Sequence, residues 1–412
     1  MTKAIRVVFS TIGFDGWGGG CDFADHLISS LANINDTKIE KYLAVAKRDP
    51  GYFYNKYILP LKVSVVALFR SGVWRYNPSP RLSPKEILHR FQKYQKSYAF
   101  SQPGSSLSDI ELFCKIISAN VLMPCIEPPS NNFKTPWIGY LYDCQHKYYP
   151  EFFSKQEIST RDASFSRLLN SATDIIVNSN SAKNDLSNFF GPFSARIHAL
   201  PFSPASSSDF IYENRDLRHN YGISEEKNYF IVSNQFWKHK NHELLFRAFA
   251  KMSEFVGTNW ELVCTGSTTD HRFPGYGDYL KSLCQDLGLN ERIKILGRIP
   301  KLDQIALMKT SYAVIQPTLF EGGPGGGSGY DAIGLGLPLL ISDIPVNREV
   351  RSNFYLRFFD PLSTSSLVEA MVSSIESNLN DRPTTSALLN NSAHYTNKLG
   401  EALLRIVNSV CE

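Results

Sequence analysis

Residues 317–338 place an acidic side chain, a run of glycines and an expected helix start within one short segment. Glu321 can accept hydrogen bonds from sugar hydroxyls, and Asp331 can do the same for ribose hydroxyls. The glycines between them can bring backbone amides close to an anionic ligand, as glycine loops before helices do. Ser328 and Asp331 also fit a capping pair for the helix that follows. The other interpretation is a plain chain reversal, but six glycines beside an acid are a costly way to build one. The glycines expected to contact the ligand are Gly325, Gly326 and Gly327.

This segment resembles the donor-site signature of glycosyltransferase family 4, whose pattern is Glu, seven residues, Glu, within a GT-B fold. Glu321 matches the first acid, and Asp331 stands for the second with two extra residues between them. Downstream, residues 334–338 and 344–349 match the family's continuation. The resemblance implies that Glu321 binds the donor sugar and that Asp331 binds the nucleotide ribose.

The loop 233–242 carries the expected diphosphate contacts. Family members usually hold the donor diphosphate there with an Arg and a Lys five residues apart. Lys240 matches the Lys, Gln235 stands at the Arg position, and Lys238 is expected to supply the missing charge. A cation suits this place because the leaving diphosphate gains negative charge as the glycosidic bond breaks. The alternative is a basic surface loop without a ligand.

Further expected contacts also come from the resemblance. Gly266 and Arg298 fall where the family packs the nucleotide base. Gly19 and Gly20 belong to a triplet that resembles the family's first glycine loop, which approaches the donor phosphate from across the cleft.

Asp143 and His146 are expected to line the acceptor side. Many relatives place a His-Asp pair at the end of the preceding strand. This chain keeps Asp143, has Tyr142 at the His position, and offers His146 three residues after the Asp. A purely structural role for His146 is the alternative.

Strand and helix patterns alternate along the chain, beginning with a strand at residues 5–9, a glycine loop at 13–20 and a helix at 22–32. Such alternation predicts parallel sheets with binding crevices at the carboxyl ends of the strands. We expect two Rossmann-like, doubly wound α/β domains of the GT-B type facing each other across a cleft. The boundaries are 1–205 for the acceptor domain, 206–392 for the donor domain and 393–412 for a C-terminal helix that returns to the first domain. A helix is also expected over 83–98.

The 412 residues carry a net charge of only +4, but thirteen Lys or Arg lie between Lys38 and Lys96 against three acids. That stretch predicts either an anionic partner, such as a membrane surface, or a solvated basic face; no nucleic-acid partner is expected. Seven scattered cysteines without a C-x-x-C pair indicate reduced thiols. We predict a cytoplasmic protein without a signal peptide or membrane span, peripheral at most to the inner face of the cytoplasmic membrane.

The resemblance implies a retaining glycosyltransferase of the hexosyltransferase class that works by front-face attack without a metal or cofactor. We expect GDP-mannose as the donor and a glycan or lipid-linked oligosaccharide as the acceptor, in cell-surface polysaccharide biosynthesis. Three alternatives are a sugar-nucleotide epimerase, an NAD-dependent oxidoreductase and a non-catalytic GT-B protein that binds nucleotide-sugars or glycans. The first would need paired carboxylates and histidines in both domains, and the second a G-x-G-x-x-G fingerprint; neither is found.

Overall fold

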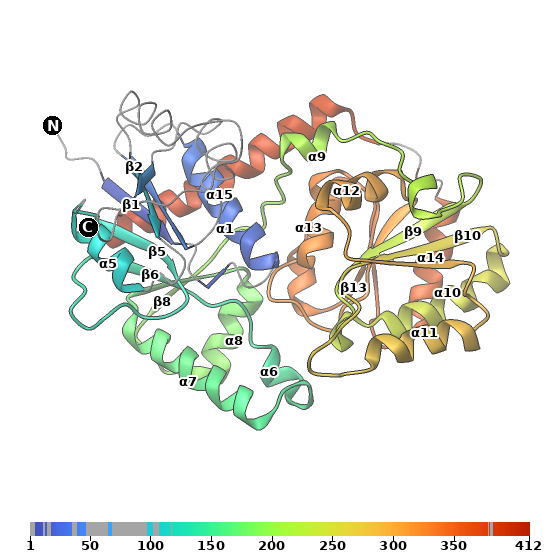
Figure 1. Cartoon of the computed structure of the whole chain (residues 1–412), viewed down its shortest axis with the longest axis horizontal. Helices are drawn as coiled ribbons and strands as arrows, with labels where there is room; N and C mark the ends of the chain where they lie inside the picture. The colour runs from blue at the N-terminus through green and yellow to red at the C-terminus, as the bar shows by residue number, and fades with distance from the viewer. Residues whose placement is uncertain are drawn as a thin grey trace.

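The computed structural model describes residues 5–10, 13–14, 18–34, 39–46, 65–67, 97–101, 107–116, 118–377, 379 and 382–412. It contains two parallel β-sheets, each covered by helices, that lie side by side along the long axis of the molecule (Figure 1). We call them the N-terminal half and the C-terminal half.

The sheet of the N-terminal half has the strand order β3-β4-β2-β1-β5-β6-β7-β8, and every described pairing in it is parallel. Its strands are β1 (Ile5–Ser10), β2 (Ile39–Ala46), β3 (Val65–Ala67), β4 (Ser97–Ser101), β5 (Val121–Cys125), β6 (Trp137–Tyr140), β7 (Asp174–Val177) and β8 (Arg196–Ala199). Its described helices are α1 (Gly18–Asn33), α5 (Leu107–Ile116), α6 (Gln145–Tyr148), η2 (Pro150–Phe152), α7 (Lys155–Ser171) and α8 (Asn180–Phe190).

The sheet of the C-terminal half has the order β11-β10-β9-β12-β13-β14, again parallel. Its strands are β9 (Asn228–Ser233), β10 (Trp260–Thr265), β11 (Ile293–Gly297), β12 (Ala313–Gln316), β13 (Leu339–Ser342) and β14 (Leu356–Phe359). Its helices are α9 (Ser208–Tyr212), η3 (His219–Tyr221), η4 (Lys238–Lys240), α10 (His242–Val256), α11 (Tyr276–Asp286), α12 (Lys301–Thr310), α13 (Gly326–Gly334), η5 (Pro345–Glu349) and α14 (Thr364–Glu376).

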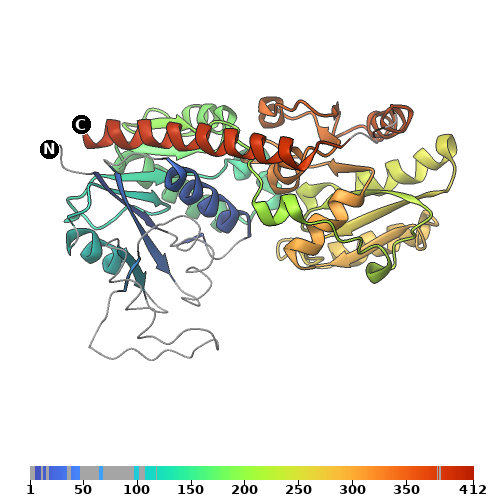
Figure 2. The ribbon, with the colours of Figure 1, turned by 90° about the horizontal axis from the view of Figure 1, so that it is seen from above.

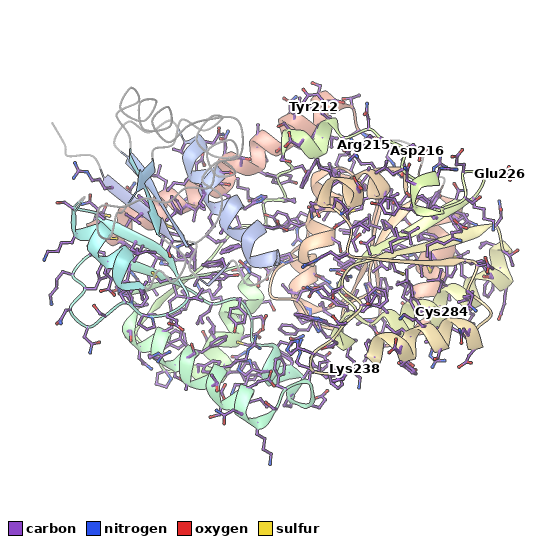
Figure 3. All side chains as sticks on the ribbon, in the orientation of Figure 1. Tyr212, Arg215, Asp216, Glu226, Lys238 and Cys284 are labelled. Atoms are coloured by element: carbon purple, nitrogen blue, oxygen red, sulfur yellow. The ribbon has the colours of Figure 1, made fainter. Side chains whose placement is uncertain are left out.

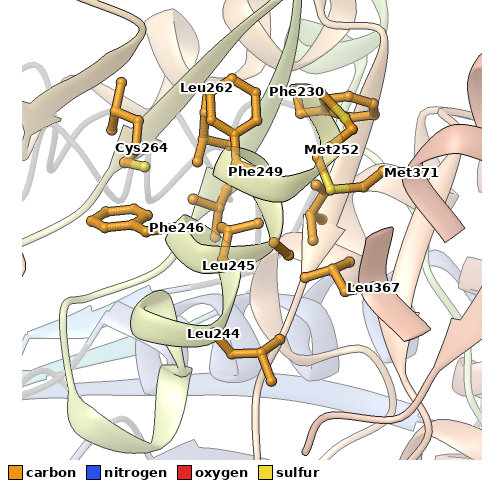
Figure 4. Close-up of a cluster of buried hydrophobic side chains, with 14 of the residues drawn as sticks. Phe230, Leu244, Leu245, Phe246, Phe249, Met252, Leu262, Cys264, Leu367 and Met371 are labelled. Carbon is orange, nitrogen blue, oxygen red and sulfur yellow. The ribbon is translucent and has the colours of Figure 1, made fainter. Parts of the chain in front are cut away.

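Helix α10 shows why the C-terminal half folds as it does. Leu245, Phe246, Phe249 and Met252 recur at helical spacing and are all fully buried against the sheet (Figure 4). The helix ends at Gly257, whose φ of 74° suits a residue without a side chain. This apolar face anchors the helix whose N-cap, Asn241, follows the predicted Lys240.

The last helix, α15 (Thr385–Cys411), crosses back to the N-terminal half and packs on α1 (Figure 2). The contact is close, because a Cβ added at Gly400 would lie 2.4 Å from the carbonyl oxygen of Ser30. The helix begins before residue 393, where the expected C-terminal segment starts, because Thr384 caps it by accepting a hydrogen bond from the Ala387 amide.

Two expectations for the N-terminal half change. The triplet Gly18–Gly20 forms the first turn of α1 and is not part of a loop. The helix expected over 83–98 lies outside the described residues up to 96, and residues 97 and 98 begin β4. Most of the basic stretch from 38 to 96 also lies outside them. In the described part of the chain, no helix is long and apolar enough to cross a membrane.

Candidate active site

The topology of the second sheet brings two predicted loops together. From β9 the chain moves outward to β10 and β11, then returns to place β12 on the other side of β9. The loops after β9 and β12 therefore flank a switch point, where parallel α/β sheets bind ligands. They touch directly, since the Leu319 amide donates to the His239 carbonyl at 2.8 Å.

Lys240 and Glu321, one from each loop, form an ion pair at this point. The Lys240 Nζ lies 2.5 Å from the Glu321 Oε1, and the two side chains are only 13% and 11% exposed. Gln316 donates its Nε2 to the same carboxylate oxygen at 3.2 Å, and Asn234 donates to the Gln316 side-chain oxygen. The hydrogen bonds hold the carboxylate in one orientation.

The N-terminus of α13 lies against the same carboxylate. Gly325 is the N-cap and Gly326 the first helical residue, and both have positive φ values, 79° and 55°. A Cβ at Gly326 would lie 2.7 Å from the Glu321 Oε1, so only glycine allows this approach. A Cβ at Gly327 would meet nothing within 4 Å. Since the first amides of a helix have no intrahelical acceptor, this end of α13 favours an anion.

Ser328 does not cap α13, because the helix begins three residues earlier than the expected capping pair requires. Its Oγ is buried and has no hydrogen-bond partner among the described residues. Asp331, the expected partner in that pair, lies 2.5 Å from the Nζ of Lys301. Burial raises the pKa of the Asp331 carboxyl, and the charge of Lys301 opposes this rise. The sequence did not single out Lys301, which follows the predicted base-binding segment directly.

One residue from the predicted diphosphate loop and one from the predicted base-binding segment lie together. Gln235 and Arg298 line one pocket, together with Asp270 and His271. Gly266 lies beside it with a φ of 129°, and a Cβ there would be 2.2 Å from the Asn234 carbonyl oxygen. Glycine at 266 is therefore required for the loops after β9 and β10 to pack together.

The chain is similar to known glycosyltransferases in sequence and in fold. Residues 213–394 match the family model of glycosyl transferases group 1. In sequence, the chain is 24% identical over 213 residues to the O-antigen chain mannosyltransferase RfbU of Salmonella typhimurium. That alignment covers 52% of this chain and 54% of the relative, so the chain spans about half the length of this curated relative.

Solved structures match over nearly the whole chain. Sucrose-phosphate synthase from Thermosynechococcus elongatus gives a TM-score of 0.60 at 14% identity, covering 98% of this chain and 94% of that one. Anabaena HepE in complex with UDP-glucose gives 0.59 at 16% identity, covering 98% and 100%. The fold is the GT-B fold that the sequence predicts.

The group 1 match contains Lys240, Glu321 and Asp331, whereas Asp143 lies in the half before it. Asp143 follows β6 and accepts a hydrogen bond from the Gln145 amide at 2.9 Å. It lies close to the acidic loop, which is the segment 317–325 between β12 and α13 that carries Glu321. A Cβ at Gly322 would lie 2.9 Å from the Asp143 Cβ and 2.3 Å from the Tyr142 carbonyl oxygen. The two halves thus meet at Gly322, which is next to Glu321 in sequence.

His146 does not line the cleft. Its side chain is fully enclosed, with the ring against Phe165 at 5.5 Å between centroids and Nε2 3.0 Å from Asp162. Burial, and then the charge of Arg161, lower the pKa of its imidazole. His146 therefore supports the segment after Asp143 from inside the protein.

Lys238 is also placed elsewhere than predicted. Its ammonium lies 4.6 Å from the ring centroid of Phe273 and 5.9 Å from that of Phe152 in the other half. Figure 3 shows Lys238 on the side of the C-terminal half that approaches α6. Lys238 thus contacts aromatic rings of both halves. Gln235 lines the pocket without the positive charge that Lys238 was expected to add there.

Gly19 and Gly20 lie in the first turn of α1, and that helix reaches the C-terminal half through His26, whose ring meets Tyr330 edge-on at 5.2 Å. Among the described residues, no three His, Cys, Asp or Glu side chains are grouped as a metal site would need.

Proposed function

We propose that the protein is a retaining hexosyltransferase that moves mannose from GDP-mannose to a glycan or lipid-linked oligosaccharide in cell-surface polysaccharide biosynthesis. The observation that carries the proposal is the Lys240–Glu321 pair at the N-terminus of α13, on the edge of the sheet that faces Asp143. The match of residues 213–394 to glycosyl transferases group 1 supports the reaction class. The name of the RfbU relative, a mannosyltransferase of O-antigen chains, supports the sugar and the product.

The donor's diphosphate would bind between Lys240 and the first-turn amides of α13. The unpartnered Oγ of Ser328 lies in that turn and offers a further hydrogen bond. The base and ribose would extend toward the pocket of Gln235 and Arg298 and toward Asp331. Glu321 would accept a hydrogen bond from a hydroxyl of the donor sugar.

The chemistry follows from these positions. As the bond between the sugar carbon and the phosphate oxygen breaks, negative charge grows on the phosphate, where Lys240 and the helix amides stabilise it. The acceptor hydroxyl would attack the face of the sugar from which the phosphate departs, so the configuration at the sugar carbon would be retained. The proton of the hydroxyl would pass to the departing phosphate oxygen. Asp143 would orient the acceptor hydroxyl. The gain lies in positioning and electrostatics, and the reaction requires no resident metal or cofactor.

A donor screen tests the proposal. The protein is incubated with GDP-mannose, UDP-glucose, UDP-galactose and UDP-N-acetylglucosamine, and nucleotide release is measured with and without EDTA. We expect release from GDP-mannose, unaffected by EDTA, and a fall of about a hundredfold or more in Glu321→Gln. Glu254→Gln, an exposed acid on α10, is the matched control. Equal turnover by Glu321→Gln and the control would refute the assignment.

We propose that the protein acts at the inner face of the cytoplasmic membrane, with the basic stretch between Lys38 and Lys96 contacting acidic lipids. Liposomes that contain acidic lipids should retain the protein at low salt and release it at high salt. If they do not retain it, the membrane contact is wrong and the enzymatic proposal stands.

A further inference from the structure

One carboxylate of the C-terminal half is hydrogen-bonded to a helix of the N-terminal half. Glu349, the last residue of η5, accepts from the backbone amide and the side-chain Nδ2 of Asn180 at 3.0 and 3.1 Å. Its other oxygen accepts from the backbone amide of Ser181 at 2.7 Å. All three donors lie in the first turn of α8.

These bonds complete the N-terminus of α8. Ser179 is the N-cap, and its Oγ accepts from the Ala182 amide at 2.9 Å. The amides of Asn180 and Ser181 are left over, because the first amides of a helix have no acceptor within it. A carboxylate there gains charge-assisted hydrogen bonds and a favourable interaction with the helix dipole. The acceptor that α8 lacks is supplied by the other half of the protein.

The same turn also holds the acidic loop. Ser179 donates its Oγ to the carbonyl oxygen of Gly322 at 3.1 Å, next to Glu321 in sequence. A Cβ at Gly323 would lie only 3.2 Å from the Asn178 Cβ. The turn that joins β7 to α8 therefore contacts both Glu349 and the loop that carries Glu321.

Glu349 and the acidic loop are linked on the donor side as well. Asn347, two residues before Glu349, accepts from the Gly325 amide at 2.9 Å with its Oδ1. Its Nδ2 donates to the Ser342 carbonyl at the end of β13 at 2.9 Å. η5 thus fixes the N-cap of α13 through Asn347 and reaches α8 through Glu349.

We propose that Glu349 is a positioning residue: by binding the first turn of α8, it sets the Glu321 loop in register with Asp143 for the transfer step. This inference rests on the proposed function. The contacts of Glu349 are to the protein itself, whereas the pocket of Gln235 and Arg298 is built within the C-terminal half. Loss of Glu349 should therefore slow turnover and leave nucleotide binding intact.

Two variants break the contact from opposite sides. Glu349→Gln removes the charge and presents an amide group to the helix amides. Asn180→Pro removes two of the three donors, while proline suits the first position of a helix. The preceding residue, Ser179, is extended with φ −160° and ψ 159°, which fits a residue before proline. Glu254→Gln is the control.

Turnover and nucleotide affinity are measured with the nucleotide-sugar that the donor screen identifies and its nucleoside diphosphate. We expect kcat to fall roughly tenfold to a hundredfold in each variant, as the loss of charge-assisted hydrogen bonds implies, with the affinity for the nucleoside diphosphate within about twofold of the wild type. Because both variants break the same contact, the kcat of the double variant should be about as low as that of the slower single variant, and not lowered by the two effects multiplied. Hydrogen exchange of the amides of residues 178–186 should accelerate in Glu349→Gln but not in the control.

Unchanged kcat in Glu349→Gln, fully multiplicative effects, or unchanged exchange of the α8 amides would each overturn the inference. A fall in nucleotide affinity as large as the fall in kcat would do the same, since it would indicate general damage to the C-terminal half. If the wild type released no nucleotide from any donor, the proposed function itself would fail, and that outcome is separate from these.

Discussion

Gly326→Ala should separate the stability of the protein from its activity. The built Cβ lies 2.6 Å from the Gln316 Nε2 and 2.7 Å from the Glu321 Oε1, so both side chains must move. An ordinary contact begins at 3.4 Å, which requires the carboxylate to retreat by about 0.7 Å. The atoms that must yield are the ends of flexible side chains, and the backbone around them can stay in place.

The stability cost is set by the backbone of residue 326. Its φ of 55° is in the left-handed region, where alanine costs roughly 1–2 kcal/mol. Gly222→Ala is the matched control, because Gly222 has a φ of 65° and its added Cβ meets nothing within 4 Å. The two variants should therefore lose similar amounts of unfolding free energy.

Activity should differ between the two. A displacement of about 1 Å at a reacting centre can cost on the order of a hundredfold in rate, so we expect a loss of that size in Gly326→Ala and none in Gly222→Ala. Thermal unfolding gives the stabilities and nucleotide release gives the rates. Wild-type turnover in Gly326→Ala would show that the orientation of Glu321 does not matter. A much lower stability than that of Gly222→Ala would show that the backbone, and not Glu321, had moved.

Three further predictions use other features of the site. Lys240→Met should weaken the binding of GDP about tenfold or more in calorimetry, because the substitution removes the cation that pairs with Glu321 and that would contact the diphosphate. An unaltered affinity would count against a role of Lys240 in donor binding. Ser328→Ala should leave the unfolding temperature unchanged, since its Oγ has no partner to lose, and should weaken GDP binding about threefold to tenfold; equal binding would remove Ser328 from the donor site. His242 is fully buried against Phe236, and burial, followed by the charge of Lys240, lowers the pKa of its imidazole to about 3. Below pH 6.5 His242 binds a proton in the unfolded chain but stays neutral in the folded protein. The free energy of unfolding therefore decreases by about 1.4 kcal/mol for each unit by which the pH is lowered. In His242→Phe, the loss between pH 7 and pH 5, measured by urea unfolding, should be smaller by about 2 kcal/mol; parallel pH profiles would disprove this.

The alternating elements could be predicted because buried strands and amphipathic helices leave direct patterns in the sequence. The β12–α13 junction shows what such patterns leave open. Its glycines and Glu321 predict a ligand site, and the sequence also favours Ser328 as part of a cap, because serine is a common N-cap residue. The left-handed backbone of Gly325 and Gly326 starts the helix earlier, and such φ values cannot be read from a run of glycines.

Contacts made across the two halves were the least predictable. Glu349 resembled part of a family loop, and nothing in its neighbourhood indicated that α8, about 170 residues earlier, lacked an acceptor for its amides. His146 had the residue type and spacing of a cleft residue, but the aromatic rings that enclose it come from α7 and α8. Lys301 was missed because its partner, Asp331, lies 30 residues further along the chain.

The chain passes between its two halves along one edge of the molecule. The outgoing segment before α9 and the returning helix α15 are joined there: Ser392 donates its Oγ to the Ser206 carbonyl at 2.6 Å, and Lys398 donates to the Phe202 carbonyl at 3.2 Å. In Figure 1 this double tether lies at the top, whereas α6 meets the C-terminal half at the bottom. The two covalent connections between the halves therefore lie side by side at this edge. A rotation of the two halves about this edge would part the α6 side and would separate Lys238 from Phe152.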